Sequence, residues 1–175
     1  MITILTDGTT KELGQGLYDT IVKTRPDARL FCLENTRIEP CYACRGCEQK
    51  TYGRCVVRDD ADAILPCVVR SETIMVLTPV VFGGYSFPIK RLVDKFALIV
   101  DRHYYFRNGE LTKGKPKGVG YYVVGVQDGI DEEETQVFKQ LVRENIWIAA
   151  WKGRPIVLPH DEGDYQQLIR EVAGI

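Results

Sequence analysis

Short apolar runs and longer amphipathic segments alternate along the chain. The apolar runs predict five strands, at residues 1–5, 28–33, 73–77, 118–126 and 154–158. The run at 73–77 (TIMVL) is apolar throughout, which is typical of a strand buried on both faces. Strands that alternate with helices in this way favour a parallel sheet with helices on both faces.

Helical periodicity predicts helices between and after these strands. The segment after the first strand carries leucine and isoleucine at helical spacing. Asp59 or Asp60 caps a second helix, which we expect Pro66 to kink or to end early. Further helices are expected near Pro88, from Asp131 and over residues 165–172.

Two segments show neither period. Residues 40–58 predict a long loop, and residues 101–117 predict an exposed loop or a hairpin around Asn108-Gly109. Ligands of parallel sheets bind beyond the carboxyl ends of the strands. We therefore expect a site in the loops that follow Leu5, Leu77 and Val126.

Length and charge bound the class of protein. The 175 residues fit one domain, residues 1–175, and the 23 basic and 24 acidic residues give a net charge of -1. This balance favours neither a nucleic-acid partner nor a membrane partner. The amino terminus lacks the features of a signal peptide, so we expect a cytoplasmic protein, in which structural disulfides are rare.

The segment at about 38–58 is rich in cysteine, and its spacing favours an iron-sulfur centre. Two C-x-x-C steps share one cysteine and a fourth cysteine follows, whereas zinc sites more often combine two separate pairs. A zinc ion and a metal-free loop, with one C-x-x-C pair acting as redox thiols, remain alternatives. We expect the other two cysteines, Cys32 and Cys67, to pack in the core. The candidate ligands are Cys41, Cys44, Cys47 and Cys55.

The order PCYACRGC, GRCVVRDD and ETIMVLTPVVFGGYSFPIKRLVDK resembles the iron-sulfur flavoprotein branch of the NADPH-dependent FMN reductase superfamily, over residues 38–102. The resemblance implies a flavodoxin-like three-layer sandwich, with a five-stranded parallel sheet in the order 2-1-3-4-5. It also implies FMN and a 4Fe-4S cluster as cofactors. The residues that it places against the flavin ring are Thr78, Pro79, Val80, Val81, Phe82, Gly83 and, in the next loop, Gly129.

The first loop departs from the family pattern. Relatives carry a Gly-Ser-Pro-Arg type sequence that holds the FMN phosphate, whereas this chain has LTDGTTK at residues 5–11. Thr9, Thr10 and Lys11 are expected to cradle the phosphate at the start of a helix. Asp7 adds a negative charge beside that dianion.

The resemblance implies an oxidoreductase in which the cluster exchanges single electrons with FMN. In related flavoproteins the cluster of one subunit lies near the flavin of another, so a homodimer or homotetramer is expected, with a ferredoxin-like donor and a small-molecule acceptor. Two alternatives remain: a cluster-free NAD(P)H-dependent FMN or quinone reductase, and a scaffold without FMN that binds metal or a partner. We assign no catalytic acid or base, because neither His103 nor His160 lies near a plausible nucleophile.

Overall fold

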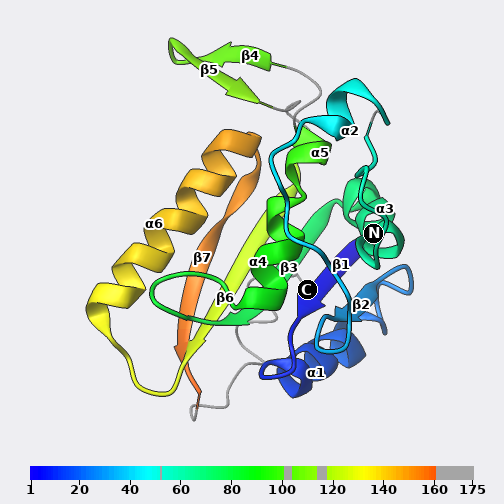
Figure 1. Cartoon of the computed structure of the whole chain (residues 1–175). Helices are drawn as coiled ribbons and strands as arrows, with labels where there is room; N and C mark the ends of the chain where they lie inside the picture. The colour runs from blue at the N-terminus through cyan, green and yellow to red at the C-terminus, as the bar shows by residue number, and fades with distance from the viewer. Residues whose placement is uncertain (52, 101–103, 114–117, 161–175) are drawn as a thin grey trace.

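The computed structural model describes residues 1–51, 53–100, 104–113 and 118–160. One parallel sheet forms its centre, with the strands in the order β2-β1-β3-β6-β7 (Figure 1). Counted over these five strands the order is 2-1-3-4-5, as predicted. The strands are β1 (Ile2–Thr6), β2 (Arg29–Cys32), β3 (Thr73–Pro79), β6 (Gly120–Gln127) and β7 (Lys152–Pro159).

Helices cover both faces of this sheet, as the sequence predicted. The residues that form the two apolar clusters place α3, α4 and α6 on one face and α1 on the other. The helix expected at residues 165–172 lies outside the described residues. The described helices are α1 (Lys11–Ile21), α2 (Gly46–Gln49), α3 (Ala61–Arg70), α4 (Phe87–Asp94), α5 (Ala97–Val100) and α6 (Glu132–Ala149).

The central strand β3 is buried on both sides, which explains its unbroken apolar sequence. Ile74 and Val76 join the cluster under α3, α4 and α6, whereas Met75 and Leu77 join the cluster under α1. All four side chains are at most 1% exposed. Because successive side chains of a strand point to opposite faces, a strand with helices on both faces needs apolar residues at every position.

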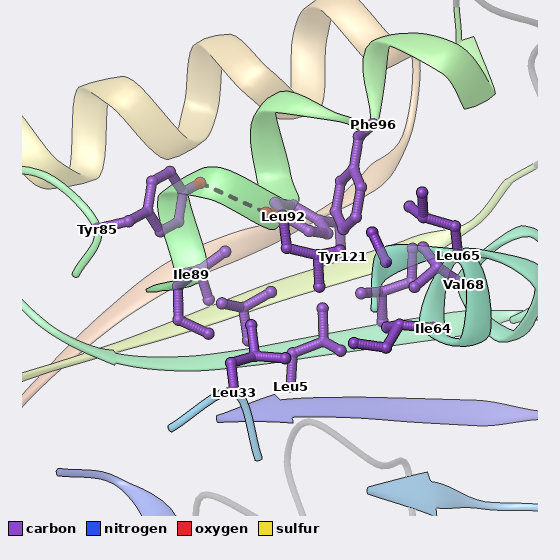
Figure 2. Packing of buried hydrophobic residues seen from close by; sticks show 14 of the residues in the cluster. Leu5, Leu33, Ile64, Leu65, Val68, Tyr85, Ile89, Leu92, Phe96 and Tyr121 are labelled. Carbon is purple, nitrogen blue, oxygen red and sulfur yellow. Dashed lines mark hydrogen bonds between the residues drawn. The ribbon is translucent and has the colours of Figure 1, made fainter. Parts of the chain in front are cut away.

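The larger cluster combines strand, helix and aromatic side chains (Figure 2). Tyr121 of β6 lies under α4, 1% exposed, with its hydroxyl 3.4 Å from that of Tyr85. Asn145 Nδ2 donates to the Tyr85 hydroxyl at 2.9 Å. Burial raises the pKa of Tyr121 well above its ordinary value and also raises the pKa of Tyr85. Both phenols therefore stay neutral and serve packing.

Of the two effects expected of Pro66, a kink or an early end, the early end does not occur, because α3 continues to Arg70. The missing amide and the ring clash cost about 3 kcal/mol. Ile64, Leu65 and Val68 are each at most 5% exposed, and burial of such side chains stabilises by about 1.5 to 3 kcal/mol each. Packing of this face therefore outweighs the cost of the proline.

Asp60 occupies the N-cap position of α3, but its side chain makes no capping hydrogen bond, and Asp59 supplies that bond instead. Asp59 Oδ1 accepts from the Ala61 amide at 3.0 Å, while Asp60 Oδ2 accepts from the Arg37 amide at 2.6 Å. Asp59 therefore caps α3, and Asp60 fixes the chain that leads into the cysteine segment.

Two segments outside the sheet differ in how well they were predicted. The hairpin at residues 101–117 is confirmed in its described part, because β4 (Tyr104–Arg107) and β5 (Glu110–Lys113) pair antiparallel. Asn108 and Gly109 have φ of 51° and 84°, as a tight hairpin turn requires. The long loop predicted at 40–58 contains one short helix, α2, that the sequence did not predict. No helix among the described residues is long and apolar enough to cross a membrane.

Candidate functional site

A cavity of about 390 Å³ opens where the strands reach their carboxyl ends. It brings together Thr9 after β1, Pro79 and Val80 at the end of β3, and Gly129 after β6. These are the three loops in which the sequence predicted a site, so four of the predicted flavin residues share one cavity. The remaining lining residues are Val126, Gln127, Asp128, Glu134 and His160.

Three of these lining side chains, Asp128, Glu134 and His160, were not anticipated. His160 Nδ1 lies 3.9 Å from Asp128 Oδ1, and the His160 amide donates to the Gln127 carbonyl at 2.7 Å. Asp128 lies in the loop after Val126, where the sequence predicted a site, so its position could have identified it as a candidate site residue. His160 follows β7, whose end was not among the three strand ends expected to form the site.

The segment after β3 forms a tight hairpin at the cavity. Val80 donates its amide to the Val126 carbonyl at 2.9 Å, and Val81 and Gly84 exchange two backbone hydrogen bonds of 3.0 and 2.9 Å. The resemblance implies that residues 78–83 contact the flavin ring, but the amides of Val80 and Val81 already donate to carbonyls of the chain. Thr78 is fully buried and fixes the hairpin, since its Oγ1 accepts from the Ser86 amide at 2.8 Å.

The tip of this hairpin leans on α6. Phe82 and Gly83 have φ of 49° and 70°, and a Cβ on Gly83 would lie 2.7 Å from Val137 Cγ1. Gly83 is therefore required by the turn and by its contact with α6. Val81 and Phe82 do not line the cavity, and Phe82 is 93% exposed.

The loop after β1 is closed by its own side chains. The Thr10 amide donates to Asp7 Oδ1 at 3.1 Å, and Thr10 Oγ1 lies 3.1 Å from the same oxygen and 2.6 Å from Thr6 Oγ1. Asp7 is 4% exposed and Thr10 is 3% exposed. A carboxylate of the chain therefore holds the position at the start of α1 that an anionic ligand would use.

The residues at this edge fit one part of FMN and not another. Pro79, Val80 and Val126 supply an apolar wall suited to a flat ring, and the volume lies in the range of small-molecule sites. The phosphate finds a different environment, because Asp7 already accepts the donors of Thr10. The cavity fits the ring, whereas the phosphate lacks the cradle that the sequence suggested.

The cysteine segment folds back on itself at the other candidate site. Ala43 and Arg45, on either side of Cys44, both adopt left-handed backbone conformations, with φ of 51° and 57°. The Gly53 amide donates to the Cys47 carbonyl at 2.8 Å, and a Cβ on Gly46 would lie 2.5 Å from Val56 Cγ1. These contacts bring the start of α2 against the chain around Cys55.

The four predicted ligands differ in burial. Cys41 and Cys44 are exposed, whereas Cys47 and Cys55 are half-buried and pack against the larger apolar cluster. No disulfide joins the six cysteines, all of which lie in the described residues. Among those residues no three His, Cys, Asp or Glu side chains are arranged to hold a metal ion. The donor types suit an iron-sulfur centre, and the loop has to rearrange to bring them together.

Cys32 and Cys67 are half-buried and belong to neither apolar cluster. The expectation that they pack in the core is therefore wrong. Cys32 Sγ donates to the Asp7 carbonyl at 3.6 Å, because β2 ends beside the first loop. Cys67 lies on α3, whose core-facing positions are taken by larger side chains.

Lys95, which follows α4, ties this segment to the helix layer. Its side chain is 1% exposed, and its Nζ donates to Asp59 Oδ2 at 2.5 Å and lies 3.9 Å from Cys55 Sγ. Burial alone raises the pKa of the Asp59 carboxyl, but hydrogen bonds from Lys95 and from the Glu39 and Ala61 amides hold that pKa below its usual value. The Asp59 carboxyl is therefore ionised at neutral pH.

The architecture is that of a flavodoxin-like protein. The chain superposes on a flavodoxin from Pseudomonas aeruginosa with a TM-score of 0.52 and 12% identity, covering 99% of this chain and 97% of that one. An FMN-dependent NADH-azoreductase from Bacillus anthracis, solved in complex with FMN, gives a TM-score of 0.64 at 12% identity, covering 99% and 96%. Similarities at such identities show the fold.

The chain belongs to the NADPH-dependent FMN reductase family, whose model matches residues 5–149. It is similar to an iron-sulfur flavoprotein of Methanocaldococcus jannaschii, with 29% identity over 89 residues, which are 51% of this chain and 45% of the relative. An iron-sulfur flavoprotein of Archaeoglobus fulgidus is 28% identical over 102 residues, 58% of this chain and 50% of the relative. The chain thus spans about half the length of these curated relatives.

Proposed function

We propose that the chain is an FMN-dependent oxidoreductase whose flavin ring lies in the cavity at the carboxyl edge. The observation that carries this proposal is the meeting of Thr9, Pro79, Val80 and Gly129 in one cavity. That edge is where parallel sheets bind their ligands, and the family binds FMN. Bound FMN supplies the hydride and electron transfer chemistry.

The chain's own residues position the ring and control its surroundings. The Val81–Gly84 bridge and the Thr78 hydroxyl hold Pro79 and Val80 in place against the ring. Phe82 lies outside the cavity lining and is exposed at the hairpin tip, so its side chain is free to fold over a bound ring. His160 lines the cavity beside Asp128, where its imidazole can hydrogen-bond a bound ligand.

The second part of the proposal is a 4Fe-4S cluster held by Cys41, Cys44, Cys47 and Cys55. Support comes from the thiol spacing and from the similarity to two archaeal iron-sulfur flavoproteins. The left-handed residues beside Cys44 curl the backbone, and such turns favour anionic centres, including iron-sulfur clusters. The Lys95 ammonium lies 3.9 Å from Cys55 Sγ, where its positive charge would attract an anionic cluster.

The two sites lie at opposite ends of the sheet within one chain (Figure 1). Electron exchange between the centres is therefore proposed to occur between subunits, in a homodimer or homotetramer. A ferredoxin-like protein is proposed as the one-electron donor, and a small molecule as the acceptor.

Metal and flavin analysis of protein purified without oxygen tests both parts. We expect flavin together with about four irons and four sulfides per chain, the content of a cubane cluster. The Cys44→Ser variant should lose iron and keep flavin. Cys67→Ser, which removes a half-buried cysteine outside the segment, is the matched control and should keep both.

A cluster-free NAD(P)H-dependent FMN or quinone reductase is the second candidate. It is favoured by the absence, among the described residues, of three ligands arranged for a metal. Flavin without iron in the wild-type protein would establish it over the first. Protein that takes up neither iron nor added flavin would contradict both, and would support a scaffold that has lost its cofactor.

A further inference from the structure

We propose that Asp7 removes the phosphate contribution to flavin binding, so that this site binds riboflavin at least as tightly as FMN. The inference rests on the proposed flavin site and concerns its selectivity. Family membership associates the chain with FMN. The geometry of the first loop indicates that the ring and the ribityl chain supply the affinity, and that the phosphate opposes it.

The first argument is that the chain has filled its own anion position. The amide of Thr10, at the start of α1, and its hydroxyl both lie 3.1 Å from Asp7 Oδ1. The Thr10 hydroxyl also lies 3.0 Å from the Leu77 carbonyl. Its single proton is therefore donated within the chain, whether to Asp7 Oδ1 or to Leu77. A phosphate at this turn would find Thr10 already bound to a carboxylate.

The second argument is the charge around the cavity, which is independent of that turn. Asp128 and Glu134 both line the cavity, and His160 is the one basic residue among its lining side chains. The Glu34 carboxyl also lies against the first loop, since a Cβ built on Gly8 would be 3.0 Å from Glu34 Oε1. Lys11 is the nearby cation, and its Nζ is already 3.8 Å from Glu34 Oε2.

These carboxylates repel the phosphate of FMN, whereas they have little effect on the uncharged ribityl end of riboflavin. Asp7 is 4% exposed, so water and salt screen its charge poorly. FMN and riboflavin share the ring and the ribityl chain and differ only in the phosphate. The ratio of their dissociation constants therefore isolates the interaction of the phosphate with the loop.

Flavin fluorescence titration of the wild-type protein, Asp7→Asn and Asp19→Asn gives this ratio. Asparagine keeps an oxygen that accepts from the Thr10 amide, so the loop keeps its shape while the charge is removed. Asp19 lies exposed on α1, and its change to asparagine alters the net charge equally. We expect Asp7→Asn to shift the ratio towards FMN by about tenfold or more, equivalent to about 1.4 kcal/mol, and Asp19→Asn to leave it unchanged.

A pH series on the wild-type protein tests the same point without a substitution. The second proton of a phosphate monoester binds with a pKa of about 6, so lowering the pH from about 7.5 to about 5.5 changes the mean phosphate charge from about -2 to about -1.2. We expect the ratio to move towards FMN. Wild-type protein that binds FMN tenfold more tightly than riboflavin, with the same ratio in Asp7→Asn, would overturn the inference and leave the proposed function intact. Failure to bind either flavin would overturn both.

Discussion

The two ends of the molecule each bury charged side chains, and they satisfy them differently. At the carboxyl edge, Asp7 accepts hydrogen bonds from the neutral donors of Thr10 in its own loop. At the cysteine end, Lys95 forms an ion pair with Asp59 and also lies beside Cys55. The first arrangement keeps an uncompensated negative charge near the cavity, whereas the second places a cation beside a thiol. The comparison teaches that a further anion is unfavourable at one end and favourable at the other.

Removing the ammonium at the cysteine end should have the largest effect on stability. Lys95→Met leaves the Asp59 carboxylate buried without its partner, and we expect a loss of about 3 to 5 kcal/mol in the free energy of unfolding. Urea denaturation measures this. Lys90→Met removes the exposed pair of Lys90 with Asp94 on the same helix and should cost less than about 0.5 kcal/mol. Equal losses in the two variants would mean that the buried pair is not special.

The carboxyl edge should depend on backbone shape more than on charge. Gly83→Ala places a methyl group 2.7 Å from Val137 Cγ1 in a left-handed turn, and we expect it to destabilise by about 2 kcal/mol. Gly109→Ala meets the same backbone strain with no atom within 4 Å, so about 1 kcal/mol is expected there. Thermal unfolding compares the two. A second change, Val137→Ala, should recover part of the loss only in the Gly83 variant.

Acid should weaken the cysteine end through Asp59. Its pKa is lowered in the folded protein, so the unfolded chain binds this proton more tightly. The stabilisation is then complete above the ordinary carboxyl pKa of about 3.9 and is lost as the pH falls through the lower folded value. We expect the difference in unfolding free energy between wild type and Asp59→Asn to stay constant from about pH 7 to about pH 5 and to shrink below about pH 4. A difference that persists below that pH would exclude the ion pair as its source.

The smallest effect on stability is expected at the exposed hairpin tip. Phe82 is 93% exposed, so Phe82→Ala should change the unfolding free energy by less than about 0.5 kcal/mol. Flavin affinity should nevertheless fall by about tenfold, because the ring loses an apolar cover. Phe106→Ala, on β4, removes another exposed phenylalanine and should leave flavin affinity unchanged. Unchanged affinity in Phe82→Ala would remove this residue from the site.

Local patterns predicted the sheet well and predicted single interruptions poorly. The apolar runs located all five strands, because a strand buried between two helix layers needs apolar residues along its length. Pro66 did not end its helix, because the free-energy cost of the proline is smaller than the stabilisation from burying the apolar face of α3. The turn at α2 was missed because Ala43 and Arg45 give no signal for left-handed conformations. Such conformations reflect contacts with distant residues.

The candidate site was predictable to the level of its loops. Strand ends are visible in sequence, and three of them met at the cavity with Thr9, Pro79, Val80 and Gly129. The orientation of each side chain was not predictable. Thr10 and Thr78 point into the body of the protein, where they bind neighbouring loops. His160 entered the site from a strand end far along the chain.

The sequence by itself determined the alternation of strands and helices and the types of donor at each end, because these follow from periodicity and composition, while the strand order and the family were implied by its resemblance to iron-sulfur flavoproteins. Only the tertiary structure decided that Asp7 closes the first loop and that Lys95 meets Asp59 and Cys55. Lys95 is brought to Asp59 and Cys55 by the packing of segments about 40 residues apart, with separations of 36 and 40. Burial then fixes the strength of these charges, since a side chain removed from water is poorly screened. Neither the contact nor the burial is encoded in any short stretch of residues.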